Sequence, residues 1–416
     1  MTDSTSFRDL GISPDLTDLL DDQGITSPFP IQAAAIPDAL AGRDLCGRAR
    51  TGSGKTLAFG LPMVQNMKEA QSKRPRARVL TPTRELCSQV GAVLGDLAEV
   101  RGFGMIEVYG GSPMQPQIDA LKRGVEIVVA TPGRLIDLLE RKALRLDDIN
   151  VVAIDEADQM ADMGFLPQVR RIMRNVPEDH QTLLFSATLD GQVGALIKAY
   201  MSDPVYHEVS PATATIETME HRFLKVHYMD KVRVAARIAR SAGRTLMFTR
   251  TKHGADRLVS DLRDEGVKTV AIHGDKQQRH REKALDRFAN GDTPVLVATN
   301  VAARGLHIEG VDLVVHYDPP DDPKTYLHRS GRTARAGEEG LVVTLVEWDQ
   351  VNEVLRIQKE AGLSLPLIKM LSNDAALDDL TSWEPDEEDL PEAGPDTKAA
   401  AARRRMRTPG RRRRRR

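Results

Sequence analysis

The sequence is poor in the residues that build disulfide frameworks, metal clusters and membrane spans. Its 416 residues include two cysteines, Cys46 and Cys87, which are too few for a disulfide framework and show no zinc-ligand spacing. No stretch reaches the roughly 18 consecutive apolar residues of a membrane span. Residues 1–5 lack the basic and apolar regions of a secretion signal. We therefore expect a soluble protein of the reducing cytoplasm, with no membrane partner.

Aromatic residues are also scarce, at 4% of the chain. Proteins that bind single-stranded nucleic acid by base stacking need exposed aromatic side chains. The scarcity therefore argues against stacking as the main mode of any nucleic-acid binding, and it favours contacts with the phosphate backbone.

The formal net charge of −2 hides two opposed segments near the end of the chain. Residues 374–396 contain ten acids and no base, whereas residues 403–416 contain ten arginines and no acid, so the two segments cancel. Such stretches cannot bury a core, and we expect residues 372–416 to be disordered. The arginines are suited to neutralising nucleic-acid phosphates.

Length and composition indicate two domains. With 41% hydrophobic residues, the chain can bury two cores. Short apolar runs alternate with helical patterns, which is typical of parallel α/β sheets. The runs form one series, Ala77–Leu80, Ile127–Ala130, Val151–Ile154 and Thr182–Phe185, and a second, Thr245–Phe248, Thr269–Ile272, Val295–Ala298, Leu313–His316 and Leu341–Leu345. We predict lobes at 41–205 and 221–371, an aperiodic linker at 206–220 and a separate segment at 1–40.

Residues 49–56 read Ala-Arg-Thr-Gly-Ser-Gly-Lys-Thr, follow an apolar turn around Leu45 and open a helical pattern at Leu57. This is the pattern of a phosphate loop, whose glycines let backbone N–H groups approach phosphates. We expect Lys55 to reach the β- and γ-phosphates and Thr56 to ligate Mg²⁺. The phosphate cradle is predicted at Thr51, Gly52, Ser53 and Gly54. By itself the loop indicates only a nucleotide-binding protein.

A second motif, Asp155-Glu156-Ala157-Asp158, ends the run Val151–Ile154. A buried parallel strand there would present Asp155 and Glu156 at its carboxyl end. One carboxylate can hold Mg²⁺ and the other can orient water. The motif resembles the signature of the bacterial-type DEAD-box RNA helicases of superfamily 2, and the resemblance continues through nearly all of residues 7–350. It implies two RecA-like lobes that use ATP and Mg²⁺ to unwind RNA.

The resemblance extends to the segment before the phosphate loop. It implies that Gln32 reads the edge of adenine and that Phe7 packs on the ring. Phe29 stands where a small hydroxyl residue is usual, and Ile25 stands where an aromatic residue is usual. The alternative is an amphipathic segment with a buried phenylalanine and a turn glutamine.

Three junctions, at residues 79–86, 129–135 and 297–301, run from an apolar strand through a threonine into a helical pattern. Threonine caps helices, and helix N-termini bind phosphates without reading sequence. With two arginines and a glycine turn they indicate a track for RNA backbone, formed by Pro82, Thr83, Arg84, Gly110, Gly111, Thr131, Pro132, Gly133, Arg134 and Thr299. The resemblance adds Thr251, Gln278 and Arg281 from the second lobe. The alternative is that these are ordinary capped or solvated helix starts.

Residues 328–337 contain Arg332 and Arg335, three apart and therefore on one face of a helical turn. The resemblance assigns them to the charge that develops on the γ-phosphate, the arginine-finger role. It also implies that Ser186, Thr188, Asp158 and His328 couple ATP to RNA.

Two residues depart from the family pattern in the second lobe. His307 stands where an aspartate usually holds the ribose hydroxyls, and it can still form one hydrogen bond there. Asn300 also stands where aspartate is common.

The sequence leaves two rival functions. One is an RNA clamp that binds ATP without turnover, and the other is a DNA translocase built on the same lobes. The complete set of Lys55, Asp155, Glu156, Arg332 and Arg335 favours an enzyme over a clamp. The Asp-Glu-Ala-Asp motif and the adenine segment favour RNA.

Overall fold

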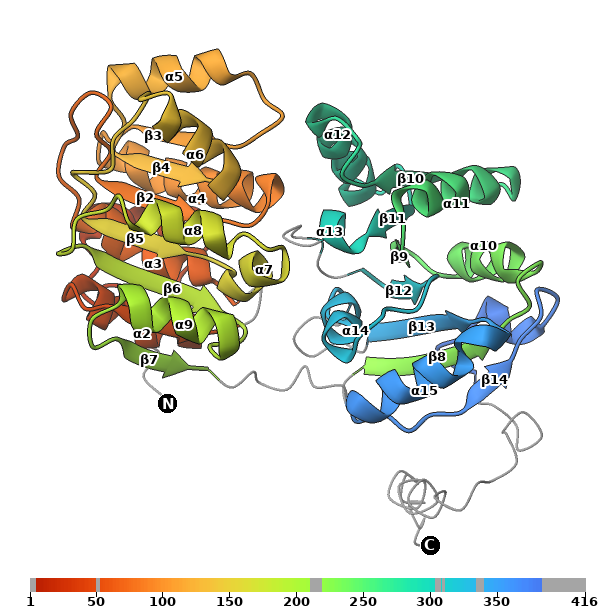
Figure 1. Cartoon of the computed structure of the whole chain (residues 1–416). Coiled ribbons are helices and arrows are strands. Elements are labelled where there is room, and N and C mark those ends of the chain that lie inside the picture. Colours follow the sequence, from red (N-terminus) through yellow and green to blue (C-terminus); the bar gives the residue numbers. More distant parts are fainter. Residues whose placement is uncertain are drawn as a thin grey trace, which may run out of the picture. The chain divides into compact units, whose positions relative to one another are not determined.

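The computed structural model describes residues 5–49, 53–209, 219–303, 308, 311–333 and 340–383. These residues form two compact units, the first ending at residue 209 and the second beginning at residue 219. Each unit contains a 7-stranded sheet with helices on both faces (Figure 1). All strand pairings are parallel, so the predicted fold class of two parallel α/β lobes is confirmed. In the parts of the chain that the structure describes, no helix has the length and apolar character that a membrane crossing demands.

The first sheet has the strand order β3-β4-β2-β5-β6-β1-β7. Its strands are β1 Leu45–Arg48, β2 Ala77–Leu80, β3 Met105–Val108, β4 Ile127–Ala130, β5 Val151–Ile154, β6 Gln181–Ser186 and β7 Val205–Glu208. Its helices are α1 Pro14–Asp22, α2 Pro30–Leu40, α3 Lys55–Gln65, α4 Arg84–Val100, α5 Met114–Arg123, α6 Pro132–Glu140, α7 Ala157–Asp162, α8 Leu166–Met173 and α9 Gly191–Tyr200. One apolar core joins helices α1–α4 to one face of the sheet, and a second core joins α5–α9 to the other.

The second sheet has the strand order β10-β11-β9-β12-β13-β8-β14. Its strands are β8 Met219–Lys225, β9 Thr245–Thr249, β10 Thr269–Ile272, β11 Val295–Thr299, β12 Leu313–His316, β13 Gly340–Val346 and β14 Leu367–Lys369. Its helices are α10 Lys231–Ser241, α11 Lys252–Asp264, α12 Gln278–Ala289, α13 Asn300–Ala303, α14 Pro323–Ser330 and α15 Val351–Glu360, with 3₁₀ turns η2 Trp348–Gln350 and η3 Ala375–Asp378. Helices α10 and α11 share one apolar core with the sheet. Helices α14 and α15 pack in a second, smaller core with Phe223 of β8.

Three predictions about the limits of these elements are wrong. The apolar turn around Leu45 is strand β1, which finds hydrogen-bonding partners in β6 and β7. Residues 206–208, predicted as linker, belong to β7, and residues 219 and 220 begin β8. Short strands with few apolar residues carry a weak sequence pattern, and their partners lie far away in the chain.

The predicted disordered tail begins too early, because the second unit continues to residue 383. Leu377 and Leu380 are buried in its core despite the acidic sequence around them. The backbone N–H of Ser372 donates to Asp230, and Arg237 donates to both carboxylate oxygens of Asp378. The remainder of that prediction, residues 384–416, lies outside the described residues, as do residues 210–218.

Arg78 is a charged residue in the core of the first unit. It lies in the middle of β2 between β4 and β5 and is 0% exposed. Its Nη2 contacts Sδ of Met173 at 3.1 Å, and among the described residues Nε and Nη1 have no hydrogen-bond partner. Burial lowers the pKa of Arg78 to about 9. The guanidinium is therefore a destabilising element of this core.

Replacing this guanidinium with an apolar side chain should stabilise the first unit. We expect Arg78→Met to raise its free energy of unfolding by about 1–4 kcal/mol, measured by urea denaturation. Arg76→Met is the matched control, because Arg76 is partly exposed and donates to the Glu69 carbonyl. A less stable Arg78→Met protein would show that the guanidinium has favourable partners.

Candidate active site

The predicted motifs of the first unit meet at the carboxyl edge of its sheet. The backbone N–H of Ala49, after β1, donates to the Ser186 carbonyl at the end of β6. In the same way Asp155, after β5, donates to the Leu80 carbonyl at the end of β2. Because parallel strands end at one edge, the segments that follow β1, β5 and β6 are neighbours. The phosphate loop and the Asp-Glu-Ala-Asp segment are therefore parts of one site.

Lys55 is the centre of this site. It is the first residue of α3 and is 6% exposed. Its Nζ lies 3.6 Å from Oδ1 of Asp155 and 4.0 Å from Oε1 of Glu156, and it donates to the Ala49 carbonyl at 3.5 Å. Gly54, immediately before it, has a φ of 80°, a conformation that glycine adopts without strain. The structure thus brings together the lysine and the two carboxylates predicted from the sequence.

Burial and neighbouring charges together set the pKa values of Asp155 and Lys55. Burial raises the pKa of Asp155 to about 6; the Lys55 charge opposes the shift and Glu156 adds to it. Burial also acts to lower the pKa of Lys55, but the charges of Asp155, Glu156 and Asp158 together raise it. Lys55 therefore keeps its proton, and the site has more negative charge than one ammonium group compensates.

The residues of this edge fit a bound Mg²⁺. Among the described residues, no three His, Cys, Asp or Glu side chains gather into a protein-only metal cage. Mg²⁺ is usually held by one or two carboxylates together with substrate phosphates and water. Asp155 supplies a carboxylate whose charge the single Lys55 ammonium group must share with Glu156. Thr56 follows Lys55 on α3, and its side chain is half-buried.

Glu156 has a strained backbone. Its φ of 53° and ψ of 51° place it in the left-handed region, and it is the N-cap of α7. Non-glycine residues in this region are uncommon and gather at functional sites. The turn directs the chain from β5 into α7 and leaves the Glu156 side chain 7% exposed, beside Lys55.

The residues predicted to recognise adenine occupy different environments. Gln32 is buried; its Nε2 donates to the Gly54 carbonyl at 2.9 Å, and its Oε1 accepts from the Phe29 N–H at 2.7 Å. Phe7 is 3% exposed and belongs to the core with α1 and α2. Phe29, in contrast, is 56% exposed. Gln32 is thus joined to the phosphate loop, and the adenine contacts of Gln32 and Phe7 both stay predictions.

Ser186 and Thr188 lie beside the Asp-Glu-Ala-Asp segment. Oγ of Ser186 accepts from the backbone N–H of Asp158 at 3.1 Å and donates to the Thr188 carbonyl at 2.7 Å. This hydroxyl therefore connects the two segments by hydrogen bonds, and the coupling role of these residues stays a prediction.

The predicted RNA contacts of the first unit also gather. Thr83 caps α4 by accepting from the Leu86 N–H, whereas Thr131 precedes α6 without a side-chain cap. A methyl group on Gly111 would overlap the Arg84 guanidinium, so Arg84 packs on the Gly110–Gly111 turn. These positions lie after β2, β3 and β4, which are adjacent strands; Pro82 and Pro132 are buried, and Gly133 is exposed.

Arg134 has partners inside its own lobe. Its Nη1 donates to the Ser112 carbonyl at 3.1 Å and to Oε1 of Gln117 at 3.2 Å, and its side chain is 10% exposed. It joins α6 to the turn before α5. An RNA contact for Arg134 stays a prediction.

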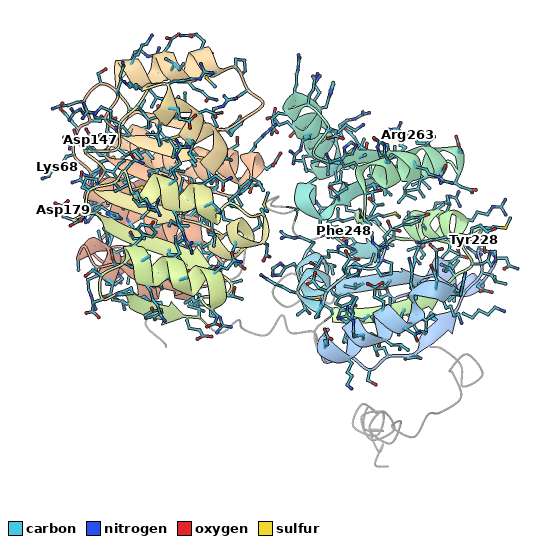
Figure 2. The ribbon with its side chains drawn as sticks, viewed as in Figure 1. Lys68, Asp147, Asp179, Tyr228, Phe248 and Arg263 are labelled. Carbon is cyan, nitrogen blue, oxygen red and sulfur yellow. The ribbon has the colours of Figure 1, made fainter. Side chains whose placement is uncertain are left out.

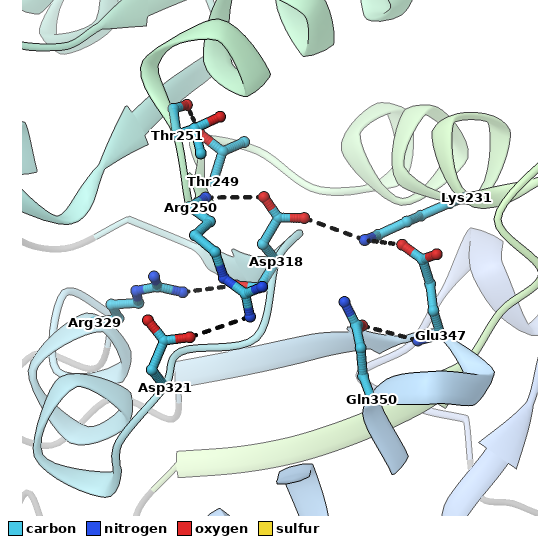
Figure 3. A network of polar contacts seen from close by, with 9 residues as sticks. All are labelled: Lys231, Thr249, Arg250, Thr251, Asp318, Asp321, Arg329, Glu347 and Gln350. Atoms are coloured by element: carbon cyan, nitrogen blue, oxygen red, sulfur yellow. Dashed lines mark hydrogen bonds and ion pairs between the residues drawn. The ribbon is translucent and has the colours of Figure 1, made fainter.

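In the second unit a polar network surrounds Asp318, which follows β12 (Figure 3). Its carboxylate accepts from the Arg250 N–H at 2.8 Å and from Nζ of Lys231 at 3.3 Å, and its carbonyl accepts from Nη1 of Arg329 at 2.8 Å. Lys231 also donates to Glu347 at 2.7 Å. The exposed Thr251 follows Arg250 and caps α11. The network thus connects the predicted RNA contact Thr251 to helix α14, which ends at Ser330, before Arg332.

Arg329 is a buried residue of that helix. Its Nε donates to Oδ1 of Asn300 at 2.6 Å, and its guanidinium lies 5.0 Å from the ring centre of Phe248, which Figure 2 labels. Asn300 therefore joins the junction after Thr299 to the segment that contains Arg332.

Of the other predicted residues, His328 and Arg332 are half-buried, Thr299 and Arg281 are buried, and Gln278 begins α12. Thr51, Gly52, His307 and Arg335 lie outside the described residues.

Comparison with known proteins decides the family. Residues 29–196 match the model of the DEAD/DEAH box helicases, and residues 225–337 match that of the helicase conserved C-terminal domain. The chain is 38% identical over 376 residues to the DEAD-box ATP-dependent RNA helicase CshA of Bacillus cereus, covering 90% of this chain and 71% of that protein. The chain belongs to the DEAD-box family of ATP-dependent RNA helicases.

Other DEAD-box helicases give the same result. CshA of Bacillus subtilis is 38% identical over 375 residues, which cover 90% of this chain and 76% of that protein. The solved structure of Saccharomyces cerevisiae Dbp5 bound to RNA and ADP BeF3 has a TM-score of 0.77 and 30% identity, covering 89% of this chain and 96% of the other. These matches confirm the resemblance seen in the sequence and the two RecA-like lobes.

Some residues of this DEAD-box site have no separate signal in the sequence. Asp318 and Lys231 carry the network of the second lobe, yet they are 87 positions apart. The one available signal is that Asp318 follows an apolar run, as Asp155 does. In the sequence Phe29 stands out only as a departure from the family pattern, and only the structure shows that it is exposed beside Gln32.

Proposed function

We propose that this helicase hydrolyses ATP at the carboxyl edge of its first sheet and uses the reaction to separate short RNA duplexes locally. The observation that carries the proposal is the buried group of Lys55, Asp155 and Glu156 at the phosphate loop. Its lysine keeps a positive charge beside two carboxylates, which is the arrangement that a triphosphate with Mg²⁺ requires.

Each residue of the group has a distinct role in this proposal. Backbone N–H groups of the loop, with Ser53 and Gly54, cradle the phosphates, and Lys55 turns from its carboxylates to the β- and γ-phosphates. Thr56 and Asp155 would hold Mg²⁺, which stabilises charge on the transferring phosphate. Glu156 orients the attacking water. Arg332 and Arg335 of the second lobe stabilise the transition state.

RNA is bound mainly through its backbone. The gathered helix starts and the Gly110–Gly111 turn offer N–H groups and the Arg84 guanidinium, which suit phosphates and read no bases. Thr251 adds an exposed helix start in the second lobe. We expect little sequence specificity. We also propose a cytoplasmic location, which the two free cysteines favour.

The dependence of ATP hydrolysis on nucleic acid tests the function. Turnover of the full chain is measured without nucleic acid, with single-stranded RNA and with single-stranded DNA. We expect strong stimulation by RNA and little by DNA. Equal turnover in all three samples would reject an RNA-dependent enzyme, and the absence of turnover in all three would favour the ATP-binding clamp.

A further inference from the structure

Phe29 is a large apolar side chain that the first lobe leaves exposed. Its exposed fraction is 56%, although Ile31 and Gln32, two and three residues later, are 1% exposed. It lies between Pro28 and Pro30 in an extended conformation, with φ of −68° and ψ of 158°, directly before α2. Proline restricts its own φ and the conformation of the residue before it. The direction in which the Phe29 side chain leaves the backbone is therefore fixed locally.

The Phe29 ring lies against the phosphate loop. A methyl group added to Gly54 would lie 2.7 Å from Cδ2 of Phe29 and would overlap Nε2 of Gln32. The ring edge and the glutamine amide therefore lie side by side next to Gly54. The same amide is fixed at both ends, since Nε2 donates to the Gly54 carbonyl and Oε1 accepts from the Phe29 N–H.

Gln32 still has the groups that an adenine edge requires. A primary amide has a second N–H and a second oxygen lone pair, and these match the N7 acceptor and N6 donor of adenine. A base read at its edge also needs a partner for its flat face. The exposed ring beside the amide supplies one, whereas Phe7 is 3% exposed within the core.

We propose that Phe29 stacks on the base of the bound nucleotide and supplies affinity for that base, while Gln32 selects its edge. This assignment rests on the proposed function, because it requires ATP at the first lobe. It makes Phe29 a residue that contributes nucleotide affinity, at a position where the family usually has a small hydroxyl side chain.

A comparison of two ligands separates the contribution of the base to affinity from that of the phosphates. The affinities of the full chain for ATP and for inorganic tripolyphosphate, both with Mg²⁺, are measured by isothermal titration calorimetry. We expect Phe29→Ala to weaken ATP about tenfold, the effect of losing one base–aromatic stack, and to leave tripolyphosphate unchanged. Phe29→Tyr keeps the ring and should keep the affinity for ATP. Tyr206→Ala is the matched control, since Tyr206 is a 59% exposed aromatic residue on β7.

Each other outcome overturns the assignment. Equal weakening of both ligands would mean that Phe29 supports the phosphate loop, and an unchanged affinity for ATP would mean that it does not touch the base. Both results leave ATP hydrolysis by the unaltered chain intact, so the proposed function would survive them. Failure of the unaltered chain to bind ATP would reject the assignment and the function together.

Discussion

Glu156→Gln is expected to bind ATP as tightly as the unaltered chain and to hydrolyse it more slowly by about 10²–10⁴-fold. The amide keeps the size of the carboxylate and leaves Lys55, Thr56 and Asp155 in place. It removes the negative charge that orients the attacking water in the proposed mechanism. Steady-state kinetics with saturating RNA measure kcat, and calorimetry measures ATP affinity. The RNA complex formed with ATP should also persist, because hydrolysis no longer ends it.

Glu126→Gln controls for the loss of a carboxylate in the same lobe. Glu126 immediately precedes β4, at the opposite edge of the sheet, where its carboxylate accepts from the N–H groups of Ala70 and Gly104. Its replacement should leave kcat nearly unchanged. Normal RNA-stimulated turnover by Glu156→Gln would remove Glu156 from the mechanism.

Lys231→Met should destabilise the second lobe by about 3 kcal/mol, because it removes a buried cation from between two carboxylates. Lys231 has a 3% exposed side chain, lies 2.7 Å from Glu347 and 3.3 Å from Asp318, and is 4.4 Å from the ring centre of Tyr317. Removing its charge leaves Asp318 and Glu347 as unpaired neighbours. Since Asp318 also accepts hydrogen bonds from the Arg250 N–H and from Arg329, helix α14 should lose part of its support. Urea denaturation measures the loss.

Lys252→Met is the matched control for this prediction. Lys252 pairs with Asp275 at 2.5 Å, but the two side chains are 51% and 62% exposed, and exposed ion pairs contribute little. Adding Glu347→Gln to Lys231→Met should recover part of the lost stability. Equal losses from Lys231→Met and Lys252→Met would show that burial of Lys231 has no energetic consequence.

The interior of each sheet could be predicted from the sequence, and the weaker strands could not. Runs such as Val151–Ile154 and Leu313–His316 are continuous and apolar because helices bury both faces of a parallel sheet. Strands β1 and β7 mix polar and small residues into four positions. These strands form because β1 can hydrogen-bond to β6, and β7 to β1. A local sequence pattern does not indicate such distant partners.

Contacts between distant residues of the candidate active site could not be predicted from the sequence either. Lys55, Asp155 and Glu156 can be predicted from the sequence because each lies in a contiguous motif whose residue types indicate its chemistry. The contacts of Gln32 with Gly54, 22 residues away, and of Asn300 with Arg329, 29 residues away, depend on how strands and helices pack. The partners that bury Arg134 are likewise set by the turn before α5, which residue types alone do not reveal.

Strand displacement tests the central claim most directly, because it joins the ATP site to its effect on RNA. A short RNA duplex with a labelled strand is incubated with the full chain and ATP, with a non-hydrolysable ATP analogue, or with no nucleotide, and Lys55→Ala is run beside each sample. We predict repeated strand release by the unaltered chain with ATP, and little release in every other sample. Equal release without nucleotide, or by Lys55→Ala, would contradict an RNA helicase driven by ATP at this site.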